Sequence, residues 1–257
     1  MKAIIVAAGR GRRLGPETAD IPKCMVQVGG RPILHRQLDA FSAAGITDFV
    51  IVRGYLGDRI TAPGFPVRFI ENPDWANNNI LTSLSYALDE MSDGFLFSYS
   101  DIVFAPAYAQ QVEKAEADVA LVIDRRWQET YVGRVQHPIS EAELASVKQT
   151  DKGSLVVDRV GKTVVSAEAA IGEFIGLAKF SASGAVALQH VWADALSHGI
   201  EQPFGRAAHL RQAYLSDALN ALADRGMPMT PVFIDGGWRE IDTEEDLSRA
   251  HDAVAGW

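Results

Sequence analysis

Short apolar runs alternate along this chain with stretches that have the spacing of amphipathic helices. Runs dominated by apolar side chains, each of a length typical of one strand, lie at residues 2–8, 49–52, 67–70 and 94–99. Apolar side chains recur every three or four positions over residues 31–44 and 80–91. Strands separated by helices in this way predict an α/β fold, with a mostly parallel Rossmann-like sheet covered by helices on both faces.

The pattern changes after about residue 118. Strands and hairpins predominate over residues 118–180, and one hairpin is predicted to turn at Val160-Gly161. Helices over 182–196 and 211–225, a strand over 230–234 and a closing helix from Thr243 follow. We therefore expect one domain over residues 1–257, with a core formed by 1–117 and 226–257 and a hairpin-rich elaboration over 118–225.

A glycine- and arginine-rich loop follows the first predicted strand. It reads Gly9-Arg10-Gly11-Arg12-Arg13-Leu14-Gly15, and Pro22-Lys23 comes shortly after. Backbone amides and cationic side chains at a strand end are what a polyphosphate needs. The glycine spacing differs from the Gly-x-Gly-x-x-Gly dinucleotide fingerprint, and Gly161-Lys162-Thr163 lacks the earlier glycine of a P-loop because Val156 stands there.

The motif Ala7-Ala8-Gly9-x-Gly11-x-Arg13, with Pro22-Lys23 after it, resembles the signature of the sugar-nucleotidyltransferase superfamily. The resemblance implies Mg²⁺-dependent transfer of a nucleotidyl group from a nucleoside triphosphate to a phosphate acceptor, with release of pyrophosphate. It also implies that residues 1–117 and 226–257 bind the nucleotide and that residues 118–225 bind the acceptor. The residues implied in binding the nucleotide are Ala7, Ala8, Gly9, Gly11, Arg12 and Arg13. Of these, Arg13 and the backbone amides of residues 9–12 would bind the β- and γ-phosphates. Lys23 would stabilise charge at the α-phosphate, so Lys23 and Arg13 are the expected catalytic residues.

Two aspartates are expected to hold the magnesium ion. Asp101 follows a buried strand, and a carboxylate at the carboxyl end of a strand suits a hard cation that also binds phosphates. Capping of the next turn is the alternative for Asp101. The stretch Trp238-x-x-Ile241-Asp242-Thr243-x-x-Asp246-Leu247 resembles the segment that supplies the second metal ligand in the superfamily, which Asp242 would match. Thr243 and Asp246 also fit the start of a helix.

The base and the acceptor are assigned through a narrower resemblance. Glu71-Asn72-Pro73, Asn78-Asn79-Ile80 and a following serine are similar to the phosphocholine and aminoalkylphosphonate cytidylyltransferases, which implies CTP. The expected nucleotide contacts are Asn78, Asn79, Ser83 and Ser100. An asparagine that caps the helix is compatible with this role. The expected acceptor contacts are Trp127, Tyr131 and Glu173 for a cationic group, and Arg134 and Lys179 for its phosphate. Packing of a hairpin is the alternative for Trp127 and Tyr131.

Composition excludes several other classes of protein. The net charge of −9 disfavours a nucleic-acid platform, and no apolar run is long enough to span a bilayer. The single cysteine, Cys24, permits no internal disulfide and fits a small packing residue in a cytoplasmic protein. The expected partners are a nucleoside triphosphate and a small phosphorylated acceptor, and the sequence gives no oligomeric state. A sugar-1-phosphate nucleotidylyltransferase and a non-catalytic nucleotide-sensing domain remain as alternatives.

Overall fold

A large mixed sheet forms the centre of the protein. The computed structural model describes residues 1–255, and within them nine strands form this sheet in the order β10-β9-β11-β6-β1-β4-β5, with β8 paired to β11 and β12 paired to β8. The strands are β1 (Lys2–Ala7), β4 (Phe49–Arg53), β5 (Val67–Glu71), β6 (Phe95–Tyr99), β8 (Val119–Asp124), β9 (Glu143–Gln149), β10 (Leu155–Lys162), β11 (Gly172–Phe180) and β12 (Met229–Ile234).

Parallel pairing brings several strand ends to one edge of the sheet. β5, β4, β1 and β6 are parallel neighbours, and β12 is parallel to β8, whereas β11 joins the sheet antiparallel to β6 and β8. Val6 lies opposite Val52 on one side and Tyr99 on the other. The loop after β1 and the turn after β6 therefore leave the sheet at the same edge, where ligands of open α/β sheets bind.

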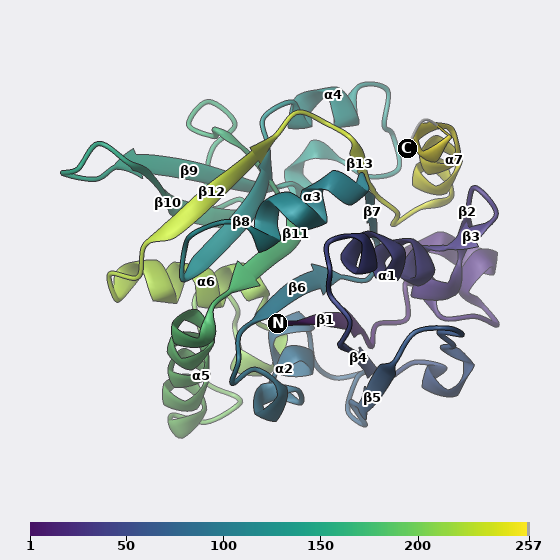
Figure 1. Cartoon of the computed structure of the whole chain (residues 1–257), viewed down its shortest axis with the longest axis horizontal. Coiled ribbons are helices and arrows are strands. Elements are labelled where there is room, and N and C mark those ends of the chain that lie inside the picture. Colours follow the sequence, from purple (N-terminus) through teal and green to yellow (C-terminus); the bar gives the residue numbers. More distant parts are fainter. Residues whose placement is uncertain (256–257) are drawn as a thin grey trace.

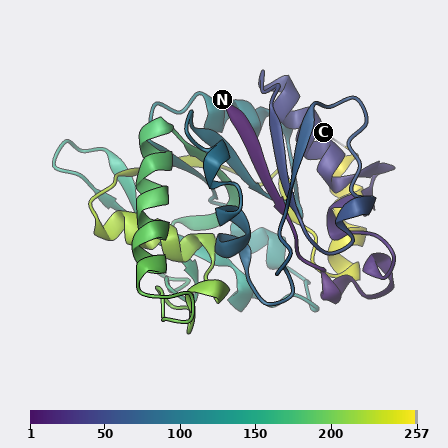
Figure 2. The ribbon, with the colours of Figure 1, turned by 90° about the horizontal axis from the view of Figure 1, so that it is seen from below.

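Helices cover both faces of the sheet, as Figures 1 and 2 show for α1 and α5. One face packs against α1 and α3, and the other packs against α2, α5 and α6. The helices are α1 (Ile33–Ala43), α2 (Ile80–Ser85), α3 (Pro106–Glu113), α4 (Trp127–Tyr131), α5 (Ala182–Ser197), α6 (Leu215–Asp224) and α7 (Glu244–Val254). The predicted α/β fold, with a mostly parallel central sheet between helical layers, is confirmed.

Short elements outside the central sheet position the last part of the chain. β7 (Ile102–Phe104) pairs antiparallel with β13 (Trp238–Glu240), and β2 (Gln27–Val28) pairs with β3 (Arg31–Pro32). The β7–β13 pair ends in a hydrogen bond of 2.8 Å from Ile241 N–H to the carbonyl of Asp101. This pairing places the segment before α7 beside the turn after β6. Figure 1 shows α7 next to β2 and β3.

Three element predictions are wrong in detail. Residues 155–162 form one strand, β10, and the hairpin turns at 150–154, where Gly153 has a φ of 82°. Asp151-Lys152-Gly153 was the turn signal, and the valines that follow pack inward from a continuous strand. The helix expected over 80–91 ends at Ser85, and a separate 3₁₀ turn follows over Leu88–Glu90. The helix expected from residue 211 begins at Leu215. The 3₁₀ turns span Arg12–Thr18, Lys23–Met25, Gly57–Arg59, Leu88–Glu90, Ile139–Glu141 and Leu210–Gln212.

Candidate active site

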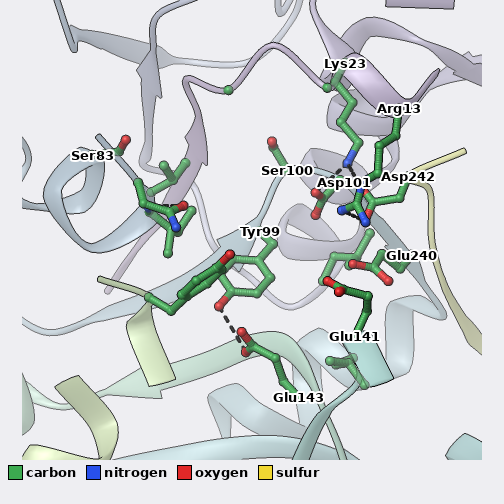
Figure 3. A pocket seen from close by; sticks show the side chains of 18 of the residues that line it. Arg13, Lys23, Ser83, Tyr99, Ser100, Asp101, Glu141, Glu143, Glu240 and Asp242 are labelled. Atoms are coloured by element: carbon green, nitrogen blue, oxygen red, sulfur yellow. Dashed lines mark hydrogen bonds and ion pairs between the residues drawn. The ribbon is translucent and has the colours of Figure 1, made fainter. Parts of the chain in front are cut away.

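A pocket of about 400 Å³ opens at the edge of the sheet where β1 and β6 end. One side of the pocket is formed by the loop after β1, and another by the turn after β6 and the end of β13 (Figure 3). The residues predicted to bind the nucleotide or metal that line it are Gly9, Gly11, Arg12, Arg13, Lys23, Asn78, Asn79, Ser83, Ser100, Asp101 and Asp242. The structure therefore gathers residues from distant parts of the sequence into one site.

A glycine in the loop after β1 leaves room for the side chain of Lys23. Gly11 has a φ of +66°, and a Cβ at this position would lie 2.8 Å from Cδ of Lys23. Any larger residue would therefore push the Lys23 side chain out of its path. Ala7 and Ala8 are buried at the end of β1 and do not line the pocket. The carbonyl of Ala8 accepts a hydrogen bond of 3.0 Å from Tyr55 N–H, which fixes the start of the loop.

Four charged side chains form a clamp at one end of the pocket. Nζ of Lys23 donates to Oδ2 of Asp101 at 2.7 Å and also to Oδ1 of Asp242, and Nη2 of Arg13 donates to the other oxygen of Asp242 at 2.5 Å. Figure 3 shows Lys23 reaching between the two aspartates. We call Lys23, Arg13, Asp101 and Asp242 the charged clamp. Its members come from three separate loops.

Burial and ion pairing shift the pKa values of Lys23 and Asp242 in opposite directions. Burial disfavours the charge of Lys23, but Asp101 and Asp242 outweigh burial and hold the pKa of its ammonium above the ordinary value. Burial likewise opposes the charge of Asp242, yet Lys23 and Arg13 keep the pKa of that carboxyl well below its usual range. Both side chains are therefore charged at neutral pH. The ion pair between Lys23 and Asp242 is therefore formed before any ligand binds.

The two aspartates also fit a magnesium ion. Their carboxylates face one ammonium nitrogen, so oxygens of both aspartates already converge on the position of one cation. Carboxylate oxygens are the donors that Mg²⁺ prefers, usually one or two per ion with waters and phosphates completing the shell. Asp101 and Asp242 would hold this ion.

An amide and hydroxyl network lies at the opposite end of the pocket from Asp242. Nδ2 of Asn72 donates to Oδ1 of Asn78 and to Oγ of Ser83, both at 2.9 Å. Asn79 caps α2 by accepting from Ile80 N–H, so its predicted capping role is confirmed. Figure 3 shows Ser83 on the side of the pocket away from Asp242. Asn72 was missed as a member of this network, although Asn72-Pro73 at the end of β5 was its signal in the sequence.

The third part of the pocket is acidic and aromatic. Tyr99 donates to Glu143 at 3.2 Å, and Tyr131 donates to Oε1 of Glu173 at 2.7 Å, whereas Oε2 of Glu173 is buried without a hydrogen-bond partner. Burial raises the pKa of Glu143 to about 7 and that of Glu173 to about 8. Phe174 and Tyr214 complete this part of the wall. We call these lining residues, Tyr99, Glu143, Glu173, Phe174 and Tyr214, the acidic pocket.

Four residues predicted to bind the acceptor lie elsewhere. Trp127 and Tyr131 turn inward from α4 into a small apolar cluster, so hairpin packing is correct for both. Arg134 is a structural residue, because its Nε donates to Asp246 at 2.6 Å and both side chains are 2% exposed. Lys179 donates to the carbonyls of residues 113 and 115 near the far end of β11. Of the predicted acceptor residues, only Glu173 lines the pocket.

Several lining residues had no assignment from the sequence. Tyr99, Glu143 and Tyr214 reach the pocket because β6, β9 and the segment before α6 converge there. Glu240 lies two positions before Asp242, and strand periodicity was the signal that both point to the same side. Cys24 is a packing residue as predicted, since it is buried and burial raises the pKa of its thiol to about 12.

The mostly parallel sheet carries three features at one edge: a glycine- and arginine-rich loop, a buried lysine and a pair of aspartates. This arrangement is typical of an α/β nucleotidyltransferase. The comparison with protein families agrees with this class. Residues 3–227 match the model of the MobA-like NTP transferase domain, and the chain belongs to this family. The resemblance to nucleotidyltransferases inferred from the first thirty residues is thereby confirmed.

The relatives include several cytidylyltransferases. The chain is 29% identical to the CTP:phosphoglutamine cytidylyltransferase of Campylobacter jejuni over 259 residues, which cover 96% of this chain and 98% of that protein. It is 31% identical to the choline-phosphate cytidylyltransferase of Streptococcus pneumoniae over 117 residues, covering 45% and 51% of the two chains. The solved inositol-1-phosphate CTP transferase from T. maritima has the same fold, with a TM-score of 0.74, 20% identity and coverage of 99% and 94%. No helix within residues 1–255 is long and apolar enough to cross a membrane.

Proposed function

We propose that this protein transfers the cytidylyl group of CTP to a small phosphate monoester or phosphonate that carries a primary amine, and releases pyrophosphate. The observation that carries the proposal is the charged clamp at one end of a pocket whose other wall is acidic. The clamp suits the phosphates of both substrates, and the acidic pocket suits a cation. The similarity to the phosphoglutamine and choline-phosphate cytidylyltransferases supports the same reaction class.

The clamp supplies charge neutralisation for an in-line displacement at the α-phosphorus. An oxygen of the acceptor phosphate forms the new P–O bond as the bond to pyrophosphate breaks. The acceptor phosphate is already ionised at neutral pH, so it needs no general base. Arg13 and the amides of residues 9–12 would bind the departing phosphates, and Lys23 would stabilise charge at the α-phosphate. Magnesium held by Asp101 and Asp242 would supply Lewis-acid neutralisation of phosphate charge.

The preference for CTP rests on the amide and hydroxyl network. Asn78 and Ser83 line the pocket, and hydrogen bonds with Asn72 and with each other fix their positions. Oγ of Ser83 accepts one hydrogen bond in this network and keeps a second lone pair, which would accept from the amino group of a cytosine. The cytidylyltransferase relatives support this choice of base.

The acidic pocket supports an amine on the acceptor. Glu173 has one buried oxygen without a partner, and an ammonium N–H would donate to it. A quaternary ammonium has no such proton, so this geometry favours a primary amine. The rings of Tyr99 and Phe174 would add cation–π attraction, whereas the ring of Tyr214 already lies 5.4 Å from Nζ of Lys162.

Pyrophosphate release tests this proposal against its alternatives. Each of the four common nucleoside triphosphates is incubated with Mg²⁺ and one of four acceptors: 2-aminoethylphosphonate, phosphocholine, inositol 1-phosphate or glucose 1-phosphate. We expect the highest rate with CTP and 2-aminoethylphosphonate. Preference for glucose 1-phosphate would favour the sugar-1-phosphate alternative. Nucleotide binding without pyrophosphate release from any pair would favour a nucleotide-sensing domain.

A further inference from the structure

A buried histidine lies beside the charged clamp without a hydrogen-bond partner. His137 belongs to the loop between α4 and β9, its side chain is 0% exposed, and neither ring nitrogen makes a hydrogen bond. Nε2 is 3.4 Å from an oxygen of Glu240, and Nδ1 is 3.4 Å from Oδ2 of Asp242. A buried imidazole normally satisfies at least one nitrogen, so this side chain is aimed at carboxylates without completing a bond to them.

The carboxylates around His137 differ in how well they are paired. Asp246 is saturated, because Oδ2 accepts from the N–H groups of Asp242 and Thr243 at 3.1 and 3.0 Å and Oδ1 accepts from Arg134. Glu240 has only a long contact of 3.4 Å with Arg134. Asp242 is held by Lys23 and Arg13, the two side chains that would turn toward phosphates. Glu240 is therefore the most weakly paired of the carboxylates around His137.

We propose that His137, Glu240 and Asp242 form a second divalent-cation site, which shares Asp242 with the proposed magnesium site and takes a transition metal such as Mn²⁺. One ligand atom from each of the three residues lies within 4.8 Å of the other two. Imidazole together with carboxylates suits Mn²⁺ and later first-row metals, whereas Mg²⁺ takes oxygen ligands. Nδ1 of His137 also lies 3.7 Å from an oxygen of Asp246, a carboxylate outside the three ligands of the kind that orients metal-ligating histidines.

The neighbouring arginine leaves room for such an ion. Arg13 now contacts Oδ2 of Asp242, but its side chain is 48% exposed and can move into the pocket. The ion would thus bind when Arg13 releases Asp242, in the absence of nucleotide or together with it. The site requires neither CTP nor an acceptor, so its test is independent of the proposed reaction.

Manganese binding to the nucleotide-free protein tests the proposal, with free Mn²⁺ measured by electron paramagnetic resonance during titration. The variants are His137→Gln, which removes the nitrogen ligand, and Asp101→Asn, which removes a carboxylate of the proposed magnesium site that is not a ligand of the second site. We expect one Mn²⁺ per wild-type chain, near-wild-type affinity in Asp101→Asn, and affinity at least about tenfold weaker in His137→Gln. Absence of binding to the wild type, or loss in Asp101→Asn with retention in His137→Gln, would overturn the proposal.

A measurement on the unaltered protein covers the case in which His137→Gln does not fold. Electron spin echo envelope modulation detects a ¹⁴N nucleus bonded to Mn²⁺. The wild-type complex should show the modulation of one imidazole nitrogen, and 15N labelling of histidine should change it. Modulation from water protons alone would mean that His137 only packs against the carboxylates, which overturns the site.

Discussion

Replacing Lys23 by methionine separates the catalytic part of the clamp from its structural part. Methionine keeps the length and most of the volume of the side chain but removes the ammonium that faces Asp101 and Asp242. A preorganised charge at the reacting phosphate contributes about 3 kcal/mol, which corresponds to a fall of roughly 150-fold in kcat/KM. We expect this fall with saturating Mg²⁺ and CTP, measured as pyrophosphate release.

The same variant should be less stable without metal. Asp101 and Asp242 would then face each other without the buried ammonium, and removing one partner of a buried ion pair costs about 3–5 kcal/mol. The side chain of Asp101 is 27% exposed and Arg13 still contacts Asp242, so we expect the lower end of this range. Urea denaturation with and without Mg²⁺ measures it, and Mg²⁺ should stabilise the variant more than the wild type.

A surface lysine provides the matched control. Lys148 pairs with Asp158 at 2.9 Å and is 58% exposed, so Lys148→Met removes an exposed ion pair and should change stability by less than about 1 kcal/mol. If Lys23→Met retained kcat/KM within threefold of the wild type, the assignment of Lys23 to the α-phosphate would be wrong.

Three further variants test other parts of the structure. Arg134→Met should destabilise the protein by about 3–5 kcal/mol in urea denaturation, because Asp246 is left buried without its ion pair, and a loss under 1 kcal/mol would contradict a structural role. Burial raises the pKa of Glu173 to about 8, so its carboxyl ionises as pH rises through that value and KM for an amine acceptor should fall between pH 7 and 9. Glu173→Gln should abolish this pH dependence, and an unchanged profile would exclude Glu173 as the titrating group. Gly176→Ala should raise the acceptor KM, because the added Cβ would overlap the Tyr99 ring and Gly176 has a φ of +81°. An unaltered KM would contradict the assignment of Tyr99 to the acceptor site.

The clamp could be predicted from the sequence because strand ends of a parallel sheet converge. Asp101 follows β6 directly, and the loop after β1 leaves the sheet beside it, so both positions follow from the order of apolar runs. Asp242 was found by resemblance, and the pairing of β7 with β13 explains its place.

The acceptor side could not be predicted in the same way. Trp127 and Tyr131 have the composition of a cation site, but the direction in which a short helix turns its side chains depends on the apolar cluster beneath it. His137 lies in a loop without periodicity, so only the folded chain shows its carboxylate neighbours.

The transfer of a labelled oxygen tests most directly the claim that an acceptor phosphate attacks the α-phosphorus within the clamp. The acceptor 2-aminoethylphosphonate is prepared with ¹⁸O in its phosphonate oxygens and incubated with unlabelled CTP and Mg²⁺. We predict a product in which the oxygen bridging the two phosphorus atoms carries ¹⁸O, and unlabelled pyrophosphate, as detected by ³¹P NMR and mass spectrometry. Label in the pyrophosphate, or free CMP without a coupled product, would contradict this account.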